Sequence, residues 1–162
     1  MRRATEAQLR VVDPPLDDDL DDGLVEGATY PLVPAGEYLA YYVDHVCVEL
    51  RQFRRSPRLF VRFRLTLAGE FTGIVLWRAY RVRRVLGRRR FIVGPRSLLT
   101  CMIWDVLGKP RRLDRISLRD LKGLLLRVRV RVVTQDSRQH PLPEGRRYSV
   151  IDQVLGKETV NR

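Results

Sequence analysis

Hydrophobic and polar residues alternate along a segment near the C-terminal end of the chain, as they do in a half-buried strand. In LLLRVRVRVVT, which begins at Leu124, one set of alternate positions is apolar: Leu124, Leu126, Val128, Val130 and Val132. The other set carries Arg127, Arg129 and Arg131, which we call the 127–131 row. Because strand side chains point alternately to opposite faces, the pattern predicts a core face and a face of three guanidinium groups.

A second segment, PRLFVRFRLTL from Pro57, repeats the pattern. Its apolar positions are Leu59, Val61, Phe63, Leu65 and Leu67. The opposite positions carry Arg58, Phe60, Arg62 and Arg64, which we call the 58–64 row. Like charges in a row repel one another unless an anion lies across them. Two basic strand faces, one with an aromatic ring, therefore indicate a sheet that holds a nucleic-acid backbone.

The remaining patterns predict three more strands and one helix. Together with the two segments above, we expect strands at residues 36–50, 58–67, 71–82, 124–134 and 146–155, and a helix at residues 95–107 that ends before Gly108 and Pro110. Alternation slips near Asp44 and His45, which indicates a bulge or a bend. Gly73 lies inside the third predicted strand and suits a strong bend. Residues 83–95 are predicted to be a basic loop.

Three strands, a helix and two strands is the element order of the OB-fold, a small Greek-key barrel. We therefore predict a mainly β fold: a five-stranded OB-like Greek-key barrel with a helix between strands 3 and 4. The alternative is an open antiparallel sheet with one helix packed on it.

Charge divides the chain into two parts. Residues 1–34 contain three Arg and eight acidic residues, whereas residues 35–162 contain 28 basic and 11 acidic residues. We predict a flexible acidic tail at residues 1–34 and an OB-like nucleic-acid-binding domain at residues 35–162. The tail either keeps a basic protein soluble, occupies the basic face or recruits a partner protein. Nearly all the cations are Arg, which a GC-rich coding sequence would also favour, but such a bias does not explain their alternate placement.

Binding a single strand without sequence preference requires cations for phosphates and flat side chains for bases. Arg81 and Arg83 share a face with Trp77 if the third strand is regular, and Tyr80 then points the opposite way. Phe53 and Phe91 lie in arginine-rich loops. The predicted nucleic-acid-binding residues are Phe53, Arg54, Arg55, Arg58, Phe60, Arg62, Arg64, Trp77, Arg81, Arg83, Arg88, Arg89, Arg90, Phe91, Arg127, Arg129 and Arg131.

The runs VPAGEYLAYYVD and RLFVRFRLTLAGEFTGIVLWRAYRV resemble phage- and plasmid-borne single-stranded-DNA-binding-like proteins. The similarity is carried by Pro34, Ala35, Gly36 and Tyr38, and then by Gly69, Phe71 and Gly73. The ending, from Asp120 to Leu155, is similar to proteins carried on mobile elements. This resemblance spans most of residues 34–156. It implies an OB-like fold and single-strand binding, and brings no catalytic residue.

No enzyme motif accompanies these features. His45 and His140 have no partner at metal-ligand spacing, and phosphate-loop and nucleophile-elbow motifs are absent from the sequence. Cys47 and Cys101 fit two reduced thiols in a cytoplasmic protein. We expect no catalysis, no metal, no cofactor and no membrane contact.

The sequence thus predicts a non-catalytic single-stranded-DNA-binding protein that serves replication, recombination or transfer of a mobile element. The alternatives are an accessory module that binds proteins, or a protein that binds RNA or duplex DNA. Pairing of an exposed edge strand between two chains would give a homo-oligomer.

Overall fold

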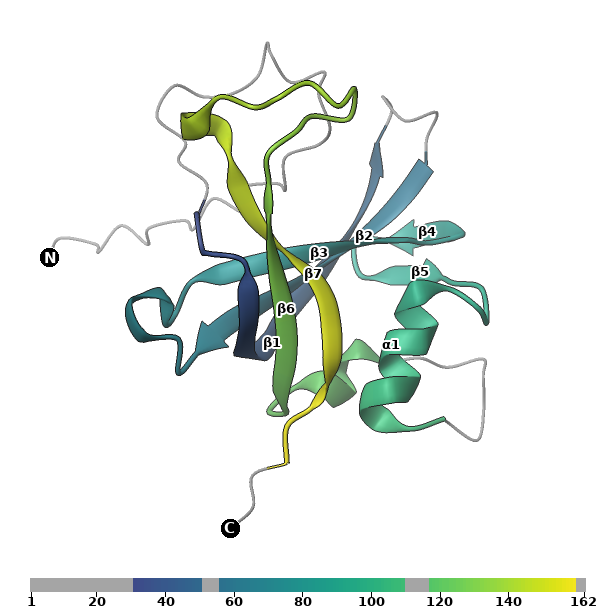
Figure 1. The fold of residues 1–162 in the computed structure, drawn as a ribbon. Coiled ribbons are helices and arrows are strands. Elements are labelled where there is room, and N and C mark those ends of the chain that lie inside the picture. The colour runs from purple at the N-terminus through teal and green to yellow at the C-terminus, as the bar shows by residue number, and fades with distance from the viewer. Residues whose placement is uncertain (1–30, 51–55, 110–116, 160–162) are drawn as a thin grey trace, which may run out of the picture.

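The computed structural model describes residues 31–50, 56–109 and 117–159 of the chain. This part is mainly β, as predicted (Figure 1). Its elements are β1 (Gly36–Leu50), β2 (Ser56–Thr66), β3 (Val75–Arg81), β4 (Arg84–Gly87), β5 (Arg90–Ile92), α1 (Leu98–Leu107), β6 (Leu125–Val133) and β7 (Tyr148–Lys157). Three single turns of 3-10 helix lie at Gly69–Phe71, Leu118–Leu121 and Glu144–Arg146.

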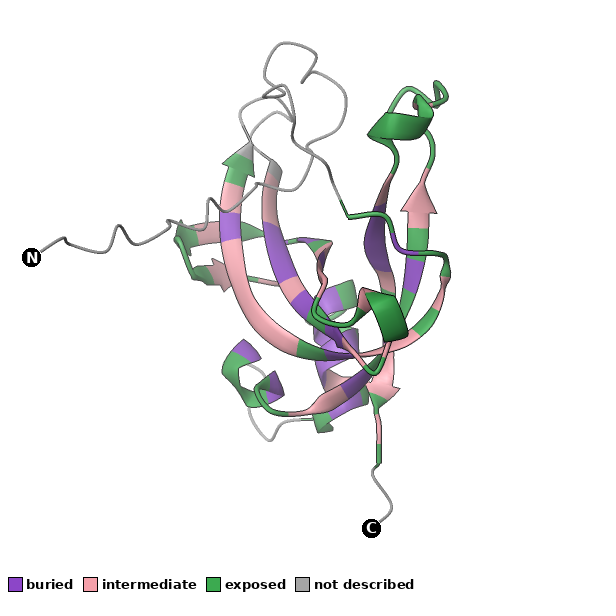
Figure 2. Cartoon of the chain, turned by 90° about the vertical axis from the view of Figure 1, so that its left-hand side faces the viewer, coloured by how far each residue is buried: buried purple, intermediate pink, exposed green. Residues whose placement is uncertain are grey.

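Five of the strands form one antiparallel sheet in the order β3-β2-β1-β6-β7. The long β1 lies at its centre: residues 36–41 pair with β6, and residues 39–50 pair with β2. The register of β1 against β2 shifts between Tyr42 and Asp44, where the alternation of the sequence slips. A bulge bends its strand and increases the local twist, so β1 can serve both halves of a curved sheet (Figure 2).

The core lies on the concave side of this sheet and under α1. Alternate residues of β2 and β6 point into it and are almost fully buried: Leu59, Val61, Phe63, Leu65, Leu126, Val128 and Val130. Helix α1 packs mainly against β7 and β3 and adds Leu99, Met102, Ile103 and Val106, which recur at helical spacing, to the same core. Its first turn is capped by Ser97, whose Oγ accepts a hydrogen bond from the Thr100 amide at 3.1 Å. The apolar faces predicted from the sequence are therefore the buried faces, except at Leu67, which lies beyond the end of β2 and is 80% exposed.

Two details of the predicted fold were wrong. The sheet does not close into a barrel, and the helix sits after the fifth strand of the chain rather than between strands 3 and 4. The intervening strands are β4 and β5, which form a separate two-stranded sheet within residues 83–95, where we expected a loop. The hairpin packs on β1: the Cys47 amide donates to the Arg88 carbonyl oxygen at 2.8 Å.

The third strand also begins later than predicted, at Val75 instead of Phe71. The preceding residues form a tight turn in which Gly73 has a φ of +90°, a left-handed conformation that glycine adopts without strain. Gly73 therefore ends a turn and does not bend a strand. This turn brings the chain back so that β3 pairs with β2 from Val75 onward.

Candidate nucleic-acid interface

A groove of about 580 Å³ lies between β3 and β7, the two edge strands of the sheet. Across it, the side chain of Arg78 on β3 donates to the Ile151 carbonyl oxygen on β7 at 3.4 Å. We call it the seam groove because it lies where the sheet would close. It is lined by Arg58, Phe60, Trp77, Arg78, Ala79, Arg131, Val132, Val133, Thr134, Gln135, Asp136, Ser137, Tyr148, Val150, Ile151 and Asp152.

Trp77 is the central aromatic side chain of the groove. Alternation along β3 turns Leu76 and Tyr80 into the core and leaves Trp77 half-buried on the outer side. Its ring lies nearly parallel to that of Tyr148 on β7, with ring centroids 6.2 Å apart and an interplanar angle of 24°. Burial raises the pKa of Tyr80 to about 12, in keeping with a core position. Of the two rings that point opposite ways, Trp77 is therefore the one available to a ligand.

Phe60 does not provide the stacking surface that we predicted for it. Only 4% of this residue is exposed, and its ring meets the Trp77 ring edge-on at a centroid distance of 5.6 Å. Trp77 and its neighbours cover the ring, so a base cannot lie against it. Phe60 instead supports Trp77 from beneath, since edge-to-face aromatic contacts are favourable.

The 127–131 row lacks the free positive charge that we expected. Each arginine is paired with a carboxylate of a neighbouring strand or strand end: Arg127 with Glu158 at 2.8 Å, Arg129 with Glu37 at 3.4 Å and Arg131 with Asp152 at 3.1 Å. The three guanidinium groups do share one exposed strand face, as alternation predicts. The anions that lie across this row belong to the protein itself, so its attraction for a polyanion is reduced.

In the 58–64 row, only one arginine is neutralised within the described residues. The Arg62 guanidinium binds both carboxylate oxygens of Asp44, and this hydrogen bonding holds the pKa of Asp44 below its ordinary range. No carboxylate of the described residues pairs with Arg58 or Arg64. Arg58 lies directly opposite Arg81 in the pairing of β2 with β3. Like charges opposite each other in a sheet are unfavourable, so this pair is a strong local source of positive potential.

The β4–β5 hairpin extends this positive surface. Arg83, Arg84, Arg88, Arg89 and Arg90 are all exposed on it. Within the described part of the chain, no ion pair joins any of these five arginines to a carboxylate. Arg83 lies two residues after Arg81, so the hairpin follows directly from the Arg58–Arg81 pair. We call Arg58, Arg81 and the five hairpin arginines the arginine surface.

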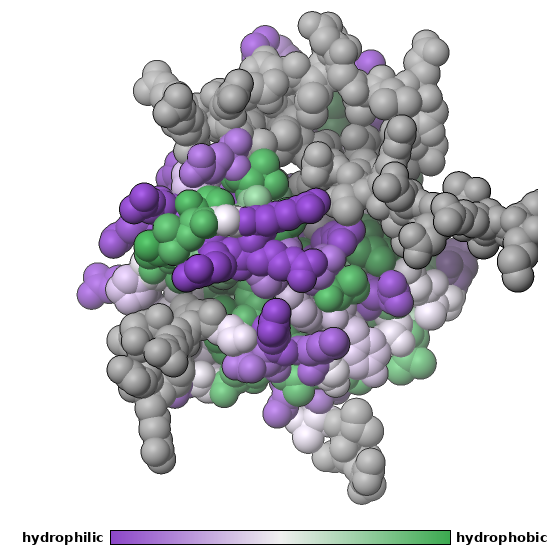
Figure 3. Space-filling view, turned by 180° about the vertical axis from the view of Figure 1, so that it is seen from behind, coloured by the Kyte–Doolittle hydropathy of each residue, from purple (hydrophilic) through white to green (hydrophobic). Residues whose placement is uncertain are grey.

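Of the two remaining aromatic residues that we predicted to bind, only Phe91 is described by the structure. Phe91 packs against the core, with its ring edge-on to His45 at a centroid distance of 5.9 Å, and does not face outward as a stacking platform. Phe53, together with Arg54 and Arg55, lies outside the described residues. Seen from behind, the molecule presents strongly hydrophilic side chains beside hydrophobic ones (Figure 3).

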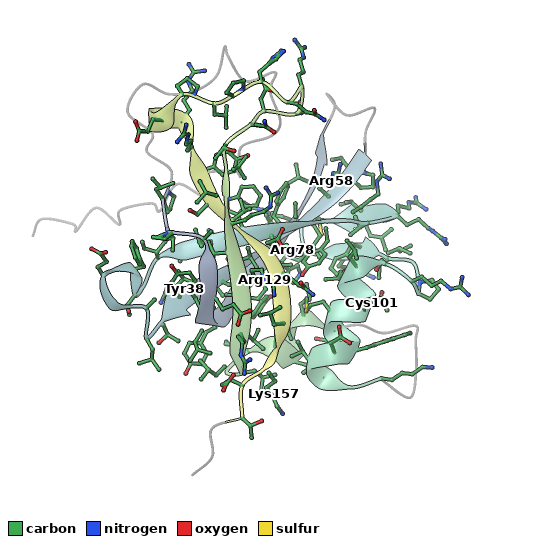
Figure 4. All side chains as sticks on the ribbon, viewed as in Figure 1. Tyr38, Arg58, Arg78, Cys101, Arg129 and Lys157 are labelled. Atoms are coloured by element: carbon green, nitrogen blue, oxygen red, sulfur yellow. The ribbon has the colours of Figure 1, made fainter. Side chains whose placement is uncertain are left out.

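The sequence patterns missed several residues of the site. Tyr148 begins the last strand and follows two arginines, so it resembles Phe60 and Trp77 in being an aromatic residue beside arginines. Its position opposite Trp77 could not be predicted, because it depends on which strands meet at the seam. Arg78 and the polar residues 134–137 were missed for the same reason. Figure 4 shows that Arg58, near the start of β2, and Arg129, in the middle of β6, lie in different parts of the molecule.

Among residues 31–50, 56–109 and 117–159, no three His, Cys, Asp or Glu side chains gather as metal ligands would. No helix in these ranges combines the length and apolar character needed to span a membrane. No family model, no curated protein and no solved structure matches the chain.

Proposed function

We propose that this protein binds single-stranded nucleic acid, without sequence preference and without catalysis, along the seam groove and the arginine surface beside it. The observation that carries the proposal is the Arg58–Arg81 pair: two cations held opposite each other, with no carboxylate partner among the described residues. Arg58 also lines the groove that contains Trp77 and Tyr148. Phosphate and base contacts are thus available side by side, which is the combination that such binding needs.

We also propose that the sheet is an OB-like barrel left open at its seam. Five antiparallel strands, a long bent β1 that pairs with strands on both sides, and edge strands joined through Arg78 support this reading. The OB-fold is itself a partly open barrel that binds oligonucleotides on its strands and loops. The extra β4–β5 hairpin then adds arginines beside the binding face.

The proposed contacts differ in kind. Arginines bind phosphate with charge-assisted hydrogen bonds that release counterions, and their contribution falls as salt rises. Trp77 provides an aromatic surface that any base can stack on, and its contribution does not depend on salt. The arginines of the 127–131 row are already paired with carboxylates, so they contribute little to phosphate binding, and they offer no aromatic surface to a base.

A salt titration of binding tests the proposal. Fluorescence anisotropy of a labelled oligo-dT is measured with the full chain between 50 and 200 mM NaCl. Four phosphate contacts would give a log–log slope of about −3, or roughly a 50-fold loss of affinity over this range. Undetectable binding, or binding that ignores salt, would contradict the proposal.

Competition then separates the nucleic acids. We expect unlabelled oligo-dT and oligo-dA to displace the probe at similar concentrations, because stacking and phosphate contacts read no base edge. Duplex DNA should compete less well, because its bases are not available to Trp77. If duplex competes best, the groove is not the binding site and the reading as a single-strand binder is wrong. An RNA oligonucleotide in the same assay decides between DNA and RNA.

A further inference from the structure

The described chain begins next to the seam groove. The carbonyl oxygen of Pro31 accepts a hydrogen bond from the Ser149 amide at 3.0 Å, and Ser149 directly follows Tyr148 of the groove. Two more hydrogen bonds fix this attachment: the buried Ser149 Oγ accepts from the Val33 amide and donates to the Val33 carbonyl oxygen, both at 2.7 Å. Pro31, where the described residues begin, is therefore held against Ser149, the residue after Tyr148 of the groove.

The sequence that precedes Pro31 contains a run of charge opposite to that of the arginine surface. Residues 13–22 contain six aspartates and no basic residue. Asp22 precedes Pro31 by nine residues, a length of chain that reaches up to roughly 30 Å when extended. This reach is comparable with the size of a small domain, so the aspartates can contact the groove and the arginines around it.

We propose that residues 13–22 dock on the arginine surface when nucleic acid is absent, and that they compete with nucleic acid for it. The proposal rests on the proposed function, since it assigns a regulator to the same surface. Exposed ion pairs between carboxylate and guanidinium groups are individually weak and are screened by salt. A docked acidic segment of this kind blocks weak, non-specific ligands and still yields to a long phosphate backbone.

The test uses the full chain with Asp17, Asp18, Asp19 and Asp21 changed to Asn. A control variant removes four carboxylates elsewhere, by changing Glu70 and Glu144 to Gln and Asp105 and Asp120 to Asn. All four of these residues are exposed, and the net charge changes equally in both variants. We call the protein with the four Asn substitutions in residues 17–21 the segment variant. We expect it to bind oligo-dT at least fivefold more tightly than the control variant at 50 mM NaCl. The difference should disappear near 1 M NaCl, where the Debye length is about 3 Å.

A second measurement detects docking without nucleic acid. Replacing Trp104 by Phe leaves Trp77 as the sole tryptophan, because the chain has two. Iodide, an anionic quencher, should quench Trp77 fluorescence about twofold more strongly in the segment variant than in the unsubstituted chain, with no such gain in the control variant. Acrylamide is an uncharged quencher, so it reports only how accessible the Trp77 ring is. A larger gain with iodide than with acrylamide would show that the loss of negative charge contributes to the change.

The two measurements separate the two proposals. If oligo-dT does not bind but iodide quenching rises, docking stands and the proposed function fails. If oligo-dT binds equally to both variants and iodide quenching is unchanged, the proposed function stands and docking is refuted.

Discussion

Replacing Trp77 by Ala removes the aromatic surface that the proposed function assigns to bases. Stacking on a protein ring contributes about 1–3 kcal/mol per base. The Tyr148 ring already lies against Trp77, with centroids 6.2 Å apart, and Phe60 covers one edge, so we expect a value in the lower half of this range. About 1–2 kcal/mol corresponds to a roughly 5- to 30-fold loss of affinity.

The salt dependence of this variant distinguishes stacking from charge. Because indole carries no charge, Trp77→Ala should lower oligo-dT affinity by the same factor at every salt concentration and leave the log–log slope unchanged. Trp77→Phe retains an aromatic ring, so its loss of oligo-dT affinity should be smaller than that of Trp77→Ala. Anisotropy titrations at four salt concentrations measure both quantities.

A folding control is needed because Trp77 also packs against the protein. A fully buried Trp→Ala change costs about 3–5 kcal/mol, and the half-buried Trp77 should cost about 2 kcal/mol of the free energy of unfolding, measured in urea. Affinity is then compared under conditions in which both proteins are folded. Equal oligo-dT affinity for Trp77→Ala and the unsubstituted protein, or a change in the slope alone, would refute the stacking role.

Three further variants test the structure around the site. Asp44→Asn breaks the pair with Arg62 and should cost about 1–2 kcal/mol of unfolding free energy at pH 7. Because Arg62 holds the pKa of Asp44 below its ordinary 3.8, the pair stabilises the fold above that pH and is lost as pH falls through the lowered value. Urea unfolding between pH 2 and 7 should therefore show a weaker acid dependence in the variant, and an unchanged profile would contradict this. Ser149→Ala should lower the free energy of unfolding by about 1–3 kcal/mol and speed hydrogen exchange at the Val33 amide, because that buried amide loses its acceptor. Exchange at the original rate would show that another acceptor replaces the Ser149 hydroxyl. Gly73→Ala should lower the free energy of unfolding by about 1 kcal/mol, because Gly73 has a φ of +90° that alanine adopts only with strain. Steric contact adds nothing, since nothing beyond the adjacent residues lies within 4 Å of the added Cβ. An unchanged free energy of unfolding in urea would show that the turn relaxes.

The sequence predicts the parts of the fold that depend on local period. Alternation in β2 and β6 identified the buried faces, and helical spacing, followed by Gly108 and Pro110, identified α1. The β4–β5 hairpin could not be recognised in this way. Its strands are four and three residues long, too short for a period to show among so many arginines.

The charge of a strand face could not be predicted, because it depends on which strands become neighbours. Arg129 meets Glu37, 92 residues earlier in the chain, only because β6 pairs with β1. Arg58, by contrast, meets Arg81 because β2 pairs with β3. Two rows that look alike in the sequence thus differ in the folded protein: one is neutralised and the other meets further positive charge.

The most direct test compares the two rows in one assay. In the variant with the four Asn substitutions, which removes most of the competing acidic charge, Arg58→Gln/Arg81→Gln is matched with Arg127→Gln/Arg129→Gln, so that each protein loses two positive charges. We expect the first pair to lower the magnitude of the log–log salt slope for oligo-dT by about 1.4, that is, about 0.7 for each phosphate that an arginine no longer neutralises. The second pair should leave the slope almost unchanged. A slope that falls only with the second pair would show that the carboxylate-paired row holds the nucleic acid, and would contradict the account.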